Sequence, residues 1–243
     1  MAKSRLDAAL VERGLSDSCE QAKRLIIAGE VIVNGHAKTK PGANVSEEDE
    51  LVVKERPKYV GRGGLKMEGA LEHFGIDPSG RICLDIGAST GGFTDCLLQQ
   101  GAEHVYTLDV GTNQLAWKIR SDPRVTAREK FNARYLKPED LEDAPSLIVI
   151  DVSFISLTKI LPAAASVLES RGMIICLIKP QFELAREEIG KGGIVKDPDL
   201  HQKACDKIWQ FVEQHETLEW KDVMDSPIKG TDGNREFLAL LTV

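Results

Sequence analysis

Leu84-Asp-Ile-Gly-Ala-Ser-Thr-Gly-Gly-Phe-Thr-Asp-Cys-Leu97 is the stretch that decides the fold. Residues 82–86 are apolar and β-prone apart from Asp85, which predicts a buried strand. A glycine turn follows, and apolar residues then recur at helical spacing until Gly101. A strand, a glycine turn and a helix N-terminus together suit a nucleotide-like ligand, because the backbone approaches closely and its N–H groups point outward.

The spacing of the glycines limits the choice of ligand. It is Gly-x-x-x-Gly-Gly from Gly87 to Gly92, not Gly-x-Gly-x-x-Gly, and no Gly-Lys-Ser/Thr follows. This argues against a dinucleotide dehydrogenase and against the phosphate loop of an NTPase. S-adenosylmethionine is the remaining common ligand of such a turn, and a purely structural strand–helix turn is the alternative.

The composition excludes several classes of protein. The longest fully apolar run, Met173–Ile178, is too short for a bilayer span, which needs ~20 residues. Residues 1–7 lack the apolar core of a signal peptide. Five cysteines without a C-x-x-C pair favour reduced thiols over zinc or disulfides. We therefore expect a cytoplasmic protein with no bound metal and no membrane partner.

The net charge of −7 is unevenly distributed. Residues 1–62 hold eleven Lys and Arg against ten Asp and Glu, whereas the remainder holds 20 against 28. Total charge does not mark a nucleic-acid binder, so the positions of the basic residues matter more.

The first 55 residues predict a small α+β module. We expect helices at 5–13 and from Ser16 or Ser18 to Gly29, a strand at 31–33, an Asn34-Gly35 turn and a strand at 51–53. Residues 54–62 are basic and contain Pro and Gly, which is typical of a linker.

This module resembles the S4-type RNA-binding domain. The matching segments are Arg5-Leu-Asp, Leu10-Val-Glu-Arg-Gly-Leu, Ala22-Lys-Arg-Leu-Ile, Ala28-Gly-Glu-Val-Ile-Val-Asn-Gly and Lys40-Pro-Gly. The resemblance implies that the second helix and its adjoining turn grip an RNA backbone without reading sequence. Cys19 departs from the arginine that is usual in that family. The RNA-binding residues expected are Arg5, Lys23, Arg24, Lys38 and Lys40, with Arg62 in the basic linker; ordinary solvated side chains are the alternative.

From Ile82 onward, strand and helix patterns alternate. Strands are expected at 82–86, 105–110, 125–127, 147–150, 173–178, 218–223 and 236–243; helices at 65–74, 157–168 and 201–215; and a turn at 230–234. Buried βα repeats predict a mostly parallel sheet with helices on both faces, which binds its ligands at the carboxyl ends of the strands.

Polar residues near the strand ends form two groups. The first fits a cofactor, because Asp109 at the end of the second strand can accept hydrogen bonds from ribose hydroxyls. Glu129 and Asn132 stand where an adenine edge would be read. The cofactor-binding set expected is Asp85, Gly87, Ser89, Gly91, Gly92, Phe93, Asp109, Val110, Glu129 and Asn132.

The second group comprises Lys66, Asp151, Lys179 and Glu236. A lysine directly after an apolar strand is costly without a carboxylate partner, so Lys179 should have one. Lys66 lies near a helix N-terminus, which is unfavourable for a cation. A structural cluster of ion pairs is the alternative reading.

Lys-Asp-Lys-Glu is also the set used by FtsJ-like ribose 2′-O-methyltransferases, and nearly the whole chain resembles the TlyA family. The matching segments are 59–66, 85–93, 108–111, 151–156, 178–183, 190–195 and 226–237, and Thr112-Asn113 and Phe131 are local departures. The resemblance implies an S4-like domain (1–55), a basic linker (56–63) and a Rossmann-like, S-adenosylmethionine-dependent methyltransferase domain (64–243) with an antiparallel C-terminal strand.

The family further implies 2′-O-methylation of cytidine in ribosomal RNA, with ribosomal RNA or subunits as partners. In-line positioning and removal of the hydroxyl proton are the main catalytic tasks. We expect Lys179 to deprotonate the hydroxyl, Asp151 to orient Lys179, Lys66 to stabilise oxyanion charge and Glu236 to position the lysines.

Three alternatives remain open. The protein could be a non-catalytic RNA-binding or ribosome-assembly factor. It could be a haemolysin, the label that family members often carry, although no strongly cationic amphipathic helix supports membrane activity. It could also methylate transfer RNA or a base, although Asp151-Val-Ser-Phe is not a base-methylation loop.

Overall fold

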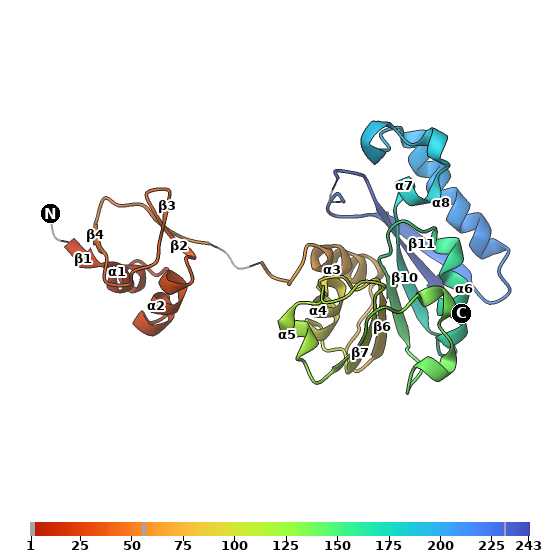
Figure 1. Cartoon of the computed structure of the whole chain (residues 1–243), viewed down its shortest axis with the longest axis horizontal. Coiled ribbons are helices and arrows are strands. Elements are labelled where there is room, and N and C mark those ends of the chain that lie inside the picture. Colours follow the sequence, from red (N-terminus) through yellow and green to blue (C-terminus); the bar gives the residue numbers. More distant parts are fainter. Residues whose placement is uncertain (1–2, 55–56, 231) are drawn as a thin grey trace. The chain divides into compact units, whose positions relative to one another are not determined.

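The computed structural model describes residues 3–54, 57–230 and 232–243, and the chain forms two compact units that divide between Pro57 and Lys58 (Figure 1). Each unit has a hydrophobic core of its own. We describe the two units separately.

The first unit is a small α+β domain. Its elements are β1 (Lys3–Arg5), α1 (Leu6–Glu12), α2 (Cys19–Ile27), β2 (Val31–Val33), β3 (His36–Lys38), β4 (Asn44–Ser46) and β5 (Leu51–Val53). Strands β3, β2 and β5 form an antiparallel sheet, while β1 pairs with β4. Leu10 and Ile26 of the two helices belong to the same buried core as Val31.

The helix cap and the tight turn expected in this unit are both present. Ser18 caps α2 by accepting a hydrogen bond from the Gln21 N–H at 3.2 Å. Asn34 and Gly35 have φ values of 49° and 79°, as the tight turn between β2 and β3 requires. Strands β1, β3 and β4 were not expected, because their residues are mostly polar and exposed, whereas the expected strands β2 and β5 are apolar.

The second unit is a larger α/β domain. Its elements are α3 (Gly63–Phe74), β6 (Ile82–Ile86), α4 (Gly92–Gln99), β7 (His104–Leu108), α5 (Trp117–Arg120), β8 (Val125–Arg128), η1 (Ala133–Tyr135), η2 (Pro138–Asp140), β9 (Leu147–Ile150), η3 (Leu157–Lys159), α6 (Leu161–Val167), β10 (Met173–Ile178), α7 (Pro180–Glu183), η4 (Arg186–Glu188), η5 (Lys191–Gly193), α8 (Pro198–Glu213), β11 (Glu219–Asp225) and β12 (Phe237–Thr242).

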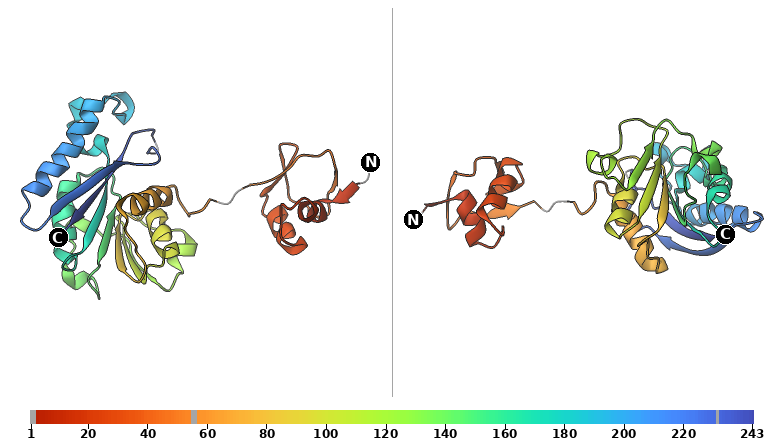
Figure 2. Two further views of the ribbon diagram at one scale, coloured as in Figure 1. Left: turned by 180° about the vertical axis from the view of Figure 1, so that it is seen from behind. Right: turned by 90° about the horizontal axis from the view of Figure 1, so that it is seen from below.

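A seven-stranded sheet in the order β11-β12-β10-β9-β6-β7-β8 forms the centre of this unit. Strands β6 to β10 are parallel, and β12 runs antiparallel to both β10 and β11. This confirms the mostly parallel sheet with an antiparallel C-terminal strand. Helices α3, α4 and α5 cover one face and α6 and α8 the other, as Figures 1 and 2 show. Because the parallel strands end at one edge, the residues that follow them gather there.

Several expected helix and strand boundaries differ from the structure by two or three residues, and two larger differences have a clear physical reason. A single helix was expected at 157–168, but the 3₁₀ turn η3 comes first and α6 begins at Leu161. Pro162 explains this, because a proline without an N–H group is tolerated in the first helical turn and not inside a helix.

The second difference concerns the linker expected at residues 56–63. Arg56 lies outside the described residues, but the chain from Lys58 onward already belongs to the second unit. Tyr59 is 3% exposed in its core, and the Val60 N–H donates to Asp95 Oδ2 at 2.8 Å. In the turn expected at 230–234, Thr231 lies outside the described residues, and the Gly230 N–H donates to the Asn234 carbonyl.

Candidate active site

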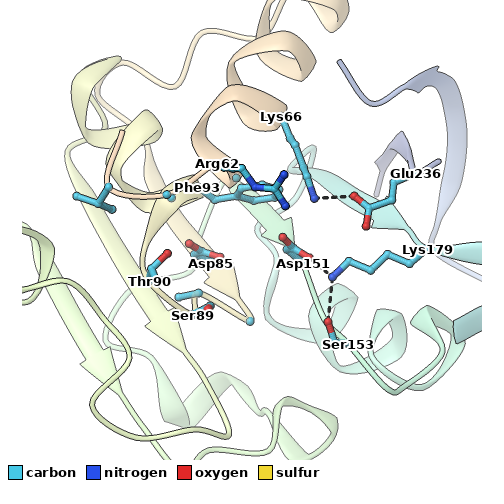
Figure 3. A pocket seen from close by; sticks show the side chains of 16 residues that line it. Arg62, Lys66, Asp85, Ser89, Thr90, Phe93, Asp151, Ser153, Lys179 and Glu236 are labelled. Carbon is cyan, nitrogen blue, oxygen red and sulfur yellow. Dashed lines mark hydrogen bonds and ion pairs between the residues drawn. The ribbon is translucent and has the colours of Figure 1, made fainter. Parts of the chain in front are cut away.

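A cavity of about 430 Å³ opens at the carboxyl edge of the sheet, a size that suits a small-molecule ligand. The four residues expected to catalyse a reaction all line it. Lys66 comes from α3, Asp151 follows β9, Lys179 follows β10 and Glu236 precedes β12. Figure 3 shows their side chains converging on one side of the cavity, opposite the glycine turn after β6.

Lys66 and Glu236 form a buried ion pair, with 2.6 Å between Nζ and Oε2. Their side chains are only 9% and 3% exposed, so each charge depends on the other for stabilisation. Gly230 lies against the Glu236 carboxylate, where even a methyl group would collide with Oε1. The absence of a side chain at Gly230 therefore makes room for this pair.

Asp151 and Lys179 form the second ion pair, with 2.5 Å between Oδ1 and Nζ. Lys179 also donates a hydrogen bond to Ser153 Oγ at 3.0 Å. This lysine is therefore held on two sides by groups from the loop that follows β9. The side chains of Lys179 and Asp151 remain 11% and 22% exposed, so a substrate can reach them.

Asp85 lies at the bottom of the same cavity and is fully buried. Its Oδ2 accepts hydrogen bonds from Thr94 N at 3.1 Å and from Thr94 Oγ1 at 2.6 Å. Burial raises the pKa of Asp85 to about 7; the Thr94 hydroxyl opposes this rise, and nearby Asp151 adds to it. Oδ1 has no protein partner and is shielded from solvent, so Asp85 acts on the cavity through its charge, which suits a positively charged ligand group nearby.

A second cavity of about 290 Å³ adjoins the first and shares Gly87, Ser89, Asp151 and Ser153 with it. The Asp109 carboxylate lies at its rim and accepts hydrogen bonds from Ser89 N and Gly111 N, both at 2.7 Å. A carboxylate has further lone pairs, so Asp109 can also accept from ribose hydroxyls. The other lining residues are mostly apolar and include Ile86, Leu108, Val110, Phe131, Ala133 and Ile160. An apolar slot beside an acidic rim suits an adenosine.

Glycine is required at each of three positions of the turn, for different structural reasons. Gly87 has a φ of 87°, and a side chain there would collide with the Asp151 carbonyl. A side chain at Gly92 would collide with the backbone of α3 at Gly64. Gly91 lines neither cavity; it has a φ of 92° and packs closely against Ile119. Phe93 lines the first cavity.

The two residues expected at an adenine edge lie in different places. Asn132 lines the second cavity, and its Oδ1 accepts a hydrogen bond from Arg134 N at 3.2 Å. Glu129 lines neither cavity. Its carboxylate accepts from Asn113 N at 2.8 Å and pairs with Arg120.

The residues expected to bind RNA are exposed. Lys23 and Arg24 lie on α2, and Lys38 and Lys40 lie in or just after β3. Arg5 in the same unit donates two hydrogen bonds to Asp7, at 3.0 and 2.7 Å. Arg62 is in the second unit, where it lines the first cavity.

Several residues that line the two cavities or hydrogen-bond to the segments around them had no role in the sequence analysis. They are Thr94, Ser153, Phe154, Glu183 and Asn234. The most unusual is Phe154, which is 90% exposed and has a φ of 63°. A large apolar side chain is rarely held in this conformation on a surface without a function. Nothing in the sequence distinguishes an exposed phenylalanine from one in the core.

Among the described residues, no cluster of His, Cys, Asp or Glu could hold a metal ion. Within that same part of the chain, no helix is both long and apolar enough to cross a membrane. The five cysteines are free thiols, and four of them are buried.

A parallel sheet with one antiparallel strand, a glycine turn and acidic strand ends defines the class of S-adenosylmethionine-dependent methyltransferases. Residues 59–242 match the FtsJ-like methyltransferase family, and residues 4–51 match the S4 domain. More distant methyltransferases share only the fold; one from Mesorhizobium loti is 13% identical with a TM-score of 0.53 and covers 75% of this chain and 100% of its own.

Closer relatives cover nearly the whole chain. The 16S/23S rRNA (cytidine-2'-O)-methyltransferase TlyA of Mycobacterium tuberculosis is 44% identical over 98% of this chain and 90% of the relative. Hemolysin A of Brachyspira hyodysenteriae is 46% identical over 97% and 98%. A solved structure from Streptococcus thermophilus, provisionally titled a hemolysin, is 48% identical, covers 100% and 89%, and has a TM-score of 0.74. The chain belongs to the TlyA family of FtsJ-like methyltransferases, and its cofactor is S-adenosylmethionine.

Proposed function

We propose that this protein transfers a methyl group from S-adenosylmethionine to the 2′-hydroxyl of a cytidine in ribosomal RNA. The observation that carries the proposal is the convergence of two lysine–carboxylate pairs on the cavity that contains Asp85. The substrate of the Mycobacterium tuberculosis relative and the S4 domain support ribosomal RNA as the acceptor.

The cofactor would bind along the two adjoining cavities. The charge of Asp85 suits its ammonium group, Asp109 its ribose hydroxyls, and the apolar slot near Val110 and Phe131 its adenine. When bound, S-adenosylmethionine supplies an activated methyl group. Gly87 and Gly92 line the first cavity, and their lack of a side chain lets the turn pack against Asp151 and against α3.

The acceptor hydroxyl needs positioning and removal of its proton. Lys179 would orient the hydroxyl and, after giving up its own proton to become a neutral amine, take the hydroxyl proton, while Asp151 and Ser153 hold the lysine in place. Lys66 would stabilise negative charge that develops on the ribose oxygen, and Glu236 keeps its ammonium at the cavity.

The nucleotide would also need a surface for its base. Phe154 is exposed beside the cavity, and its ring centroid lies 5.0 Å from that of Phe182. Single-stranded bases commonly stack on aromatic side chains, so this ring suits the base of an unstacked nucleotide. Lys23, Arg24, Lys38 and Lys40 of the first unit would contact phosphates elsewhere on the RNA.

Transfer of a labelled methyl group to ribosomal RNA or ribosomal subunits tests the proposal. We expect Lys179→Ala to lower the rate ~10²- to 10⁴-fold, the usual contribution of a general base, while cofactor and RNA binding persist. Lys159→Ala removes an exposed lysine after the same loop and is the matched control. If Lys179→Ala transferred the methyl group to a 2′-hydroxyl at the wild-type rate, the assignment of Lys179 as the general base would be wrong.

Two other functions give different results. A non-catalytic RNA-binding factor transfers no label from the cofactor. A haemolysin, the name of the Brachyspira hyodysenteriae relative, lyses erythrocytes as purified protein. We expect no lysis by either the wild-type protein or Lys179→Ala; lysis by both would favour the haemolysin.

A further inference from the structure

Glu183, the last residue of α7, is a buried carboxylate for which the reaction described above has no role. It is 4% exposed and lies four residues after Lys179. A carboxylate is buried only where hydrogen bonds and a cation compensate for its lost hydration. The partners of Glu183 therefore show what its burial achieves.

Three donors from two other segments converge on this carboxylate. Oε1 accepts a hydrogen bond from the Leu157 N–H at 2.8 Å. Oε2 accepts from the Ser156 hydroxyl at 2.5 Å and lies 3.1 Å from Lys207 Nζ of α8. Lys207 also donates to the Glu183 backbone carbonyl. Glu183 thus connects α7, α8 and the end of the loop that follows β9.

The connected segments are the ones that carry the second ion pair of the site. Asp151 and Ser153 lie in the loop that ends at Ser156, and Lys179 immediately precedes α7. Strands β9 and β10 are paired through Cys176 and Ile150, so sheet hydrogen bonds stop before both catalytic side chains. Beyond these side chains, Glu183 links the segment that follows Lys179 to the end of the loop that carries Asp151.

We propose that Glu183 is a positioning residue for methyl transfer, which keeps the Asp151 loop and the Lys179 segment at a fixed separation. This inference rests on the proposed function. Glu183 acts only through Lys179 and its partners and touches neither substrate. Displacing a catalytic group by ~1 Å can cost about 100-fold in rate, so a remote carboxylate in this place has a large effect.

The donor set explains why the residue is glutamate. An amide at this position could still accept from the Leu157 N–H, and the Ser156 hydroxyl could turn to accept from its NH₂ group. It could not satisfy Lys207, which has donors only. Glu183→Gln should therefore be partly active, and Lys207→Met should restore activity to it by removing the donor that faces the amide.

The test measures kcat, KM for RNA, the Kd for S-adenosylmethionine and the melting temperature of the full-length protein. We expect Glu183→Ala to lower kcat about 100-fold and Glu183→Gln about 10-fold, with a smaller change in cofactor Kd. Glu188→Ala is the matched control, because Glu188 pairs with Lys203 of α8 but bonds to neither loop residue. It should keep kcat within about twofold of wild type.

A double-mutant comparison separates positioning from loss of structure. If Glu183 acts through Lys179, then Glu183→Gln should cost little further activity in single-turnover assays of the Lys179→Ala protein. An equal loss in both backgrounds, or a wild-type kcat for Glu183→Ala, would overturn the inference. An active Lys179→Ala protein would instead overturn the proposed function, so the two failures are distinguishable.

Discussion

Burial distinguishes two aspartates that look alike in the sequence. Asp85 and Asp109 each stand at a strand end near the glycine turn, and both were expected to bind the cofactor. In the structure, Asp109 accepts two backbone hydrogen bonds, whereas one oxygen of the fully buried Asp85 has no protein partner. The pKa of Asp85 is accordingly raised to about 7, so this residue can respond to pH near neutrality.

We predict that affinity for S-adenosylmethionine increases from pH 6 to pH 8. A carboxyl with a pKa raised to about 7 is mostly protonated at the lower pH and mostly ionised at the higher. Only the ionised form attracts an ammonium group, so binding should strengthen by up to ~10-fold per pH unit below that pKa. Isothermal titration calorimetry at pH 6, 7 and 8 measures this.

Asp85→Asn is the control for this prediction, because it keeps an oxygen for Thr94 but cannot ionise. It should bind more weakly at pH 8 and show a smaller change with pH. The same slope in both proteins would mean that another group, or the ligand itself, is responsible.

At the scale of elements, the segment between β11 and β12 holds one of the two ion pairs in place. Asn234, 1% exposed, accepts from the Val195 N–H at 2.9 Å and donates to the Gly193 carbonyl at 3.0 Å. Gly230, at the start of the same segment, packs against Glu236, which follows Asn234 by two residues. The segment was expected only as a turn, because the partners of Asn234 are 39 and 41 residues away in the chain.

We predict that Gly230→Ala disrupts the buried ion pair and slows methyl transfer about 10- to 100-fold, an effect similar to that of a misplaced catalytic group. The added methyl group would collide with Glu236 Oε1 and move the carboxylate away from Lys66. Methyl-transfer assays and cofactor titrations measure the effect, and cofactor affinity should change less than the rate. Asp232→Ala, an exposed change in the same segment, should be silent. A silent Gly230→Ala would show that the pair tolerates displacement.

At the scale of the whole molecule, the two units have separate cores. The proposed function therefore assigns RNA binding mainly to the first unit, and cofactor binding and methyl transfer to the second. The first unit carries five of the six residues expected to bind RNA, and the second carries Arg62 and both cavities. Residues 58–62 have the composition of a linker, yet Tyr59 is buried in the second unit. Composition describes average solvation and cannot reveal that one aromatic ring within a basic stretch finds a buried site.

We predict that a fragment of residues 58–243 folds and binds S-adenosylmethionine but methylates ribosomal RNA far more slowly than the full chain at low RNA concentration. Loss of the basic residues in the first unit should weaken RNA binding and reduce its dependence on salt. Thermal unfolding, calorimetry and methyl-transfer assays at several salt concentrations test this. Equal RNA affinity of the fragment and the full chain would contradict it.

A shorter fragment, residues 64–243, is the matched comparison. It lacks Tyr59, and removing a buried aromatic side chain costs about 3–5 kcal/mol of stability. It should therefore melt well below the longer fragment. Equal melting temperatures would show that residues 58–63 do not belong to the folded unit.

Much of the fold was predictable because its signals are local. The strand, glycine turn and helix at 82–101, the Asn34-Gly35 turn and the capped α2 each depend on residues a few positions apart. The sequence by itself therefore determined the two-domain order, the mostly parallel sheet and the polar residues at its strand ends. It also indicated, through resemblance, that Lys66, Asp151, Lys179 and Glu236 belong together.

Only the tertiary structure decided how those residues are paired. Lys66 meets Glu236 across 170 positions of the chain, and Glu183 meets the loop after β9 across 26 and 27. Such contacts depend on strand order and on which side chains are removed from water, and neither is encoded by neighbouring residues alone. For the same reason, the sequence predicted Asp85 as a cofactor residue, but only its burial gave that carboxylate a pKa near 7.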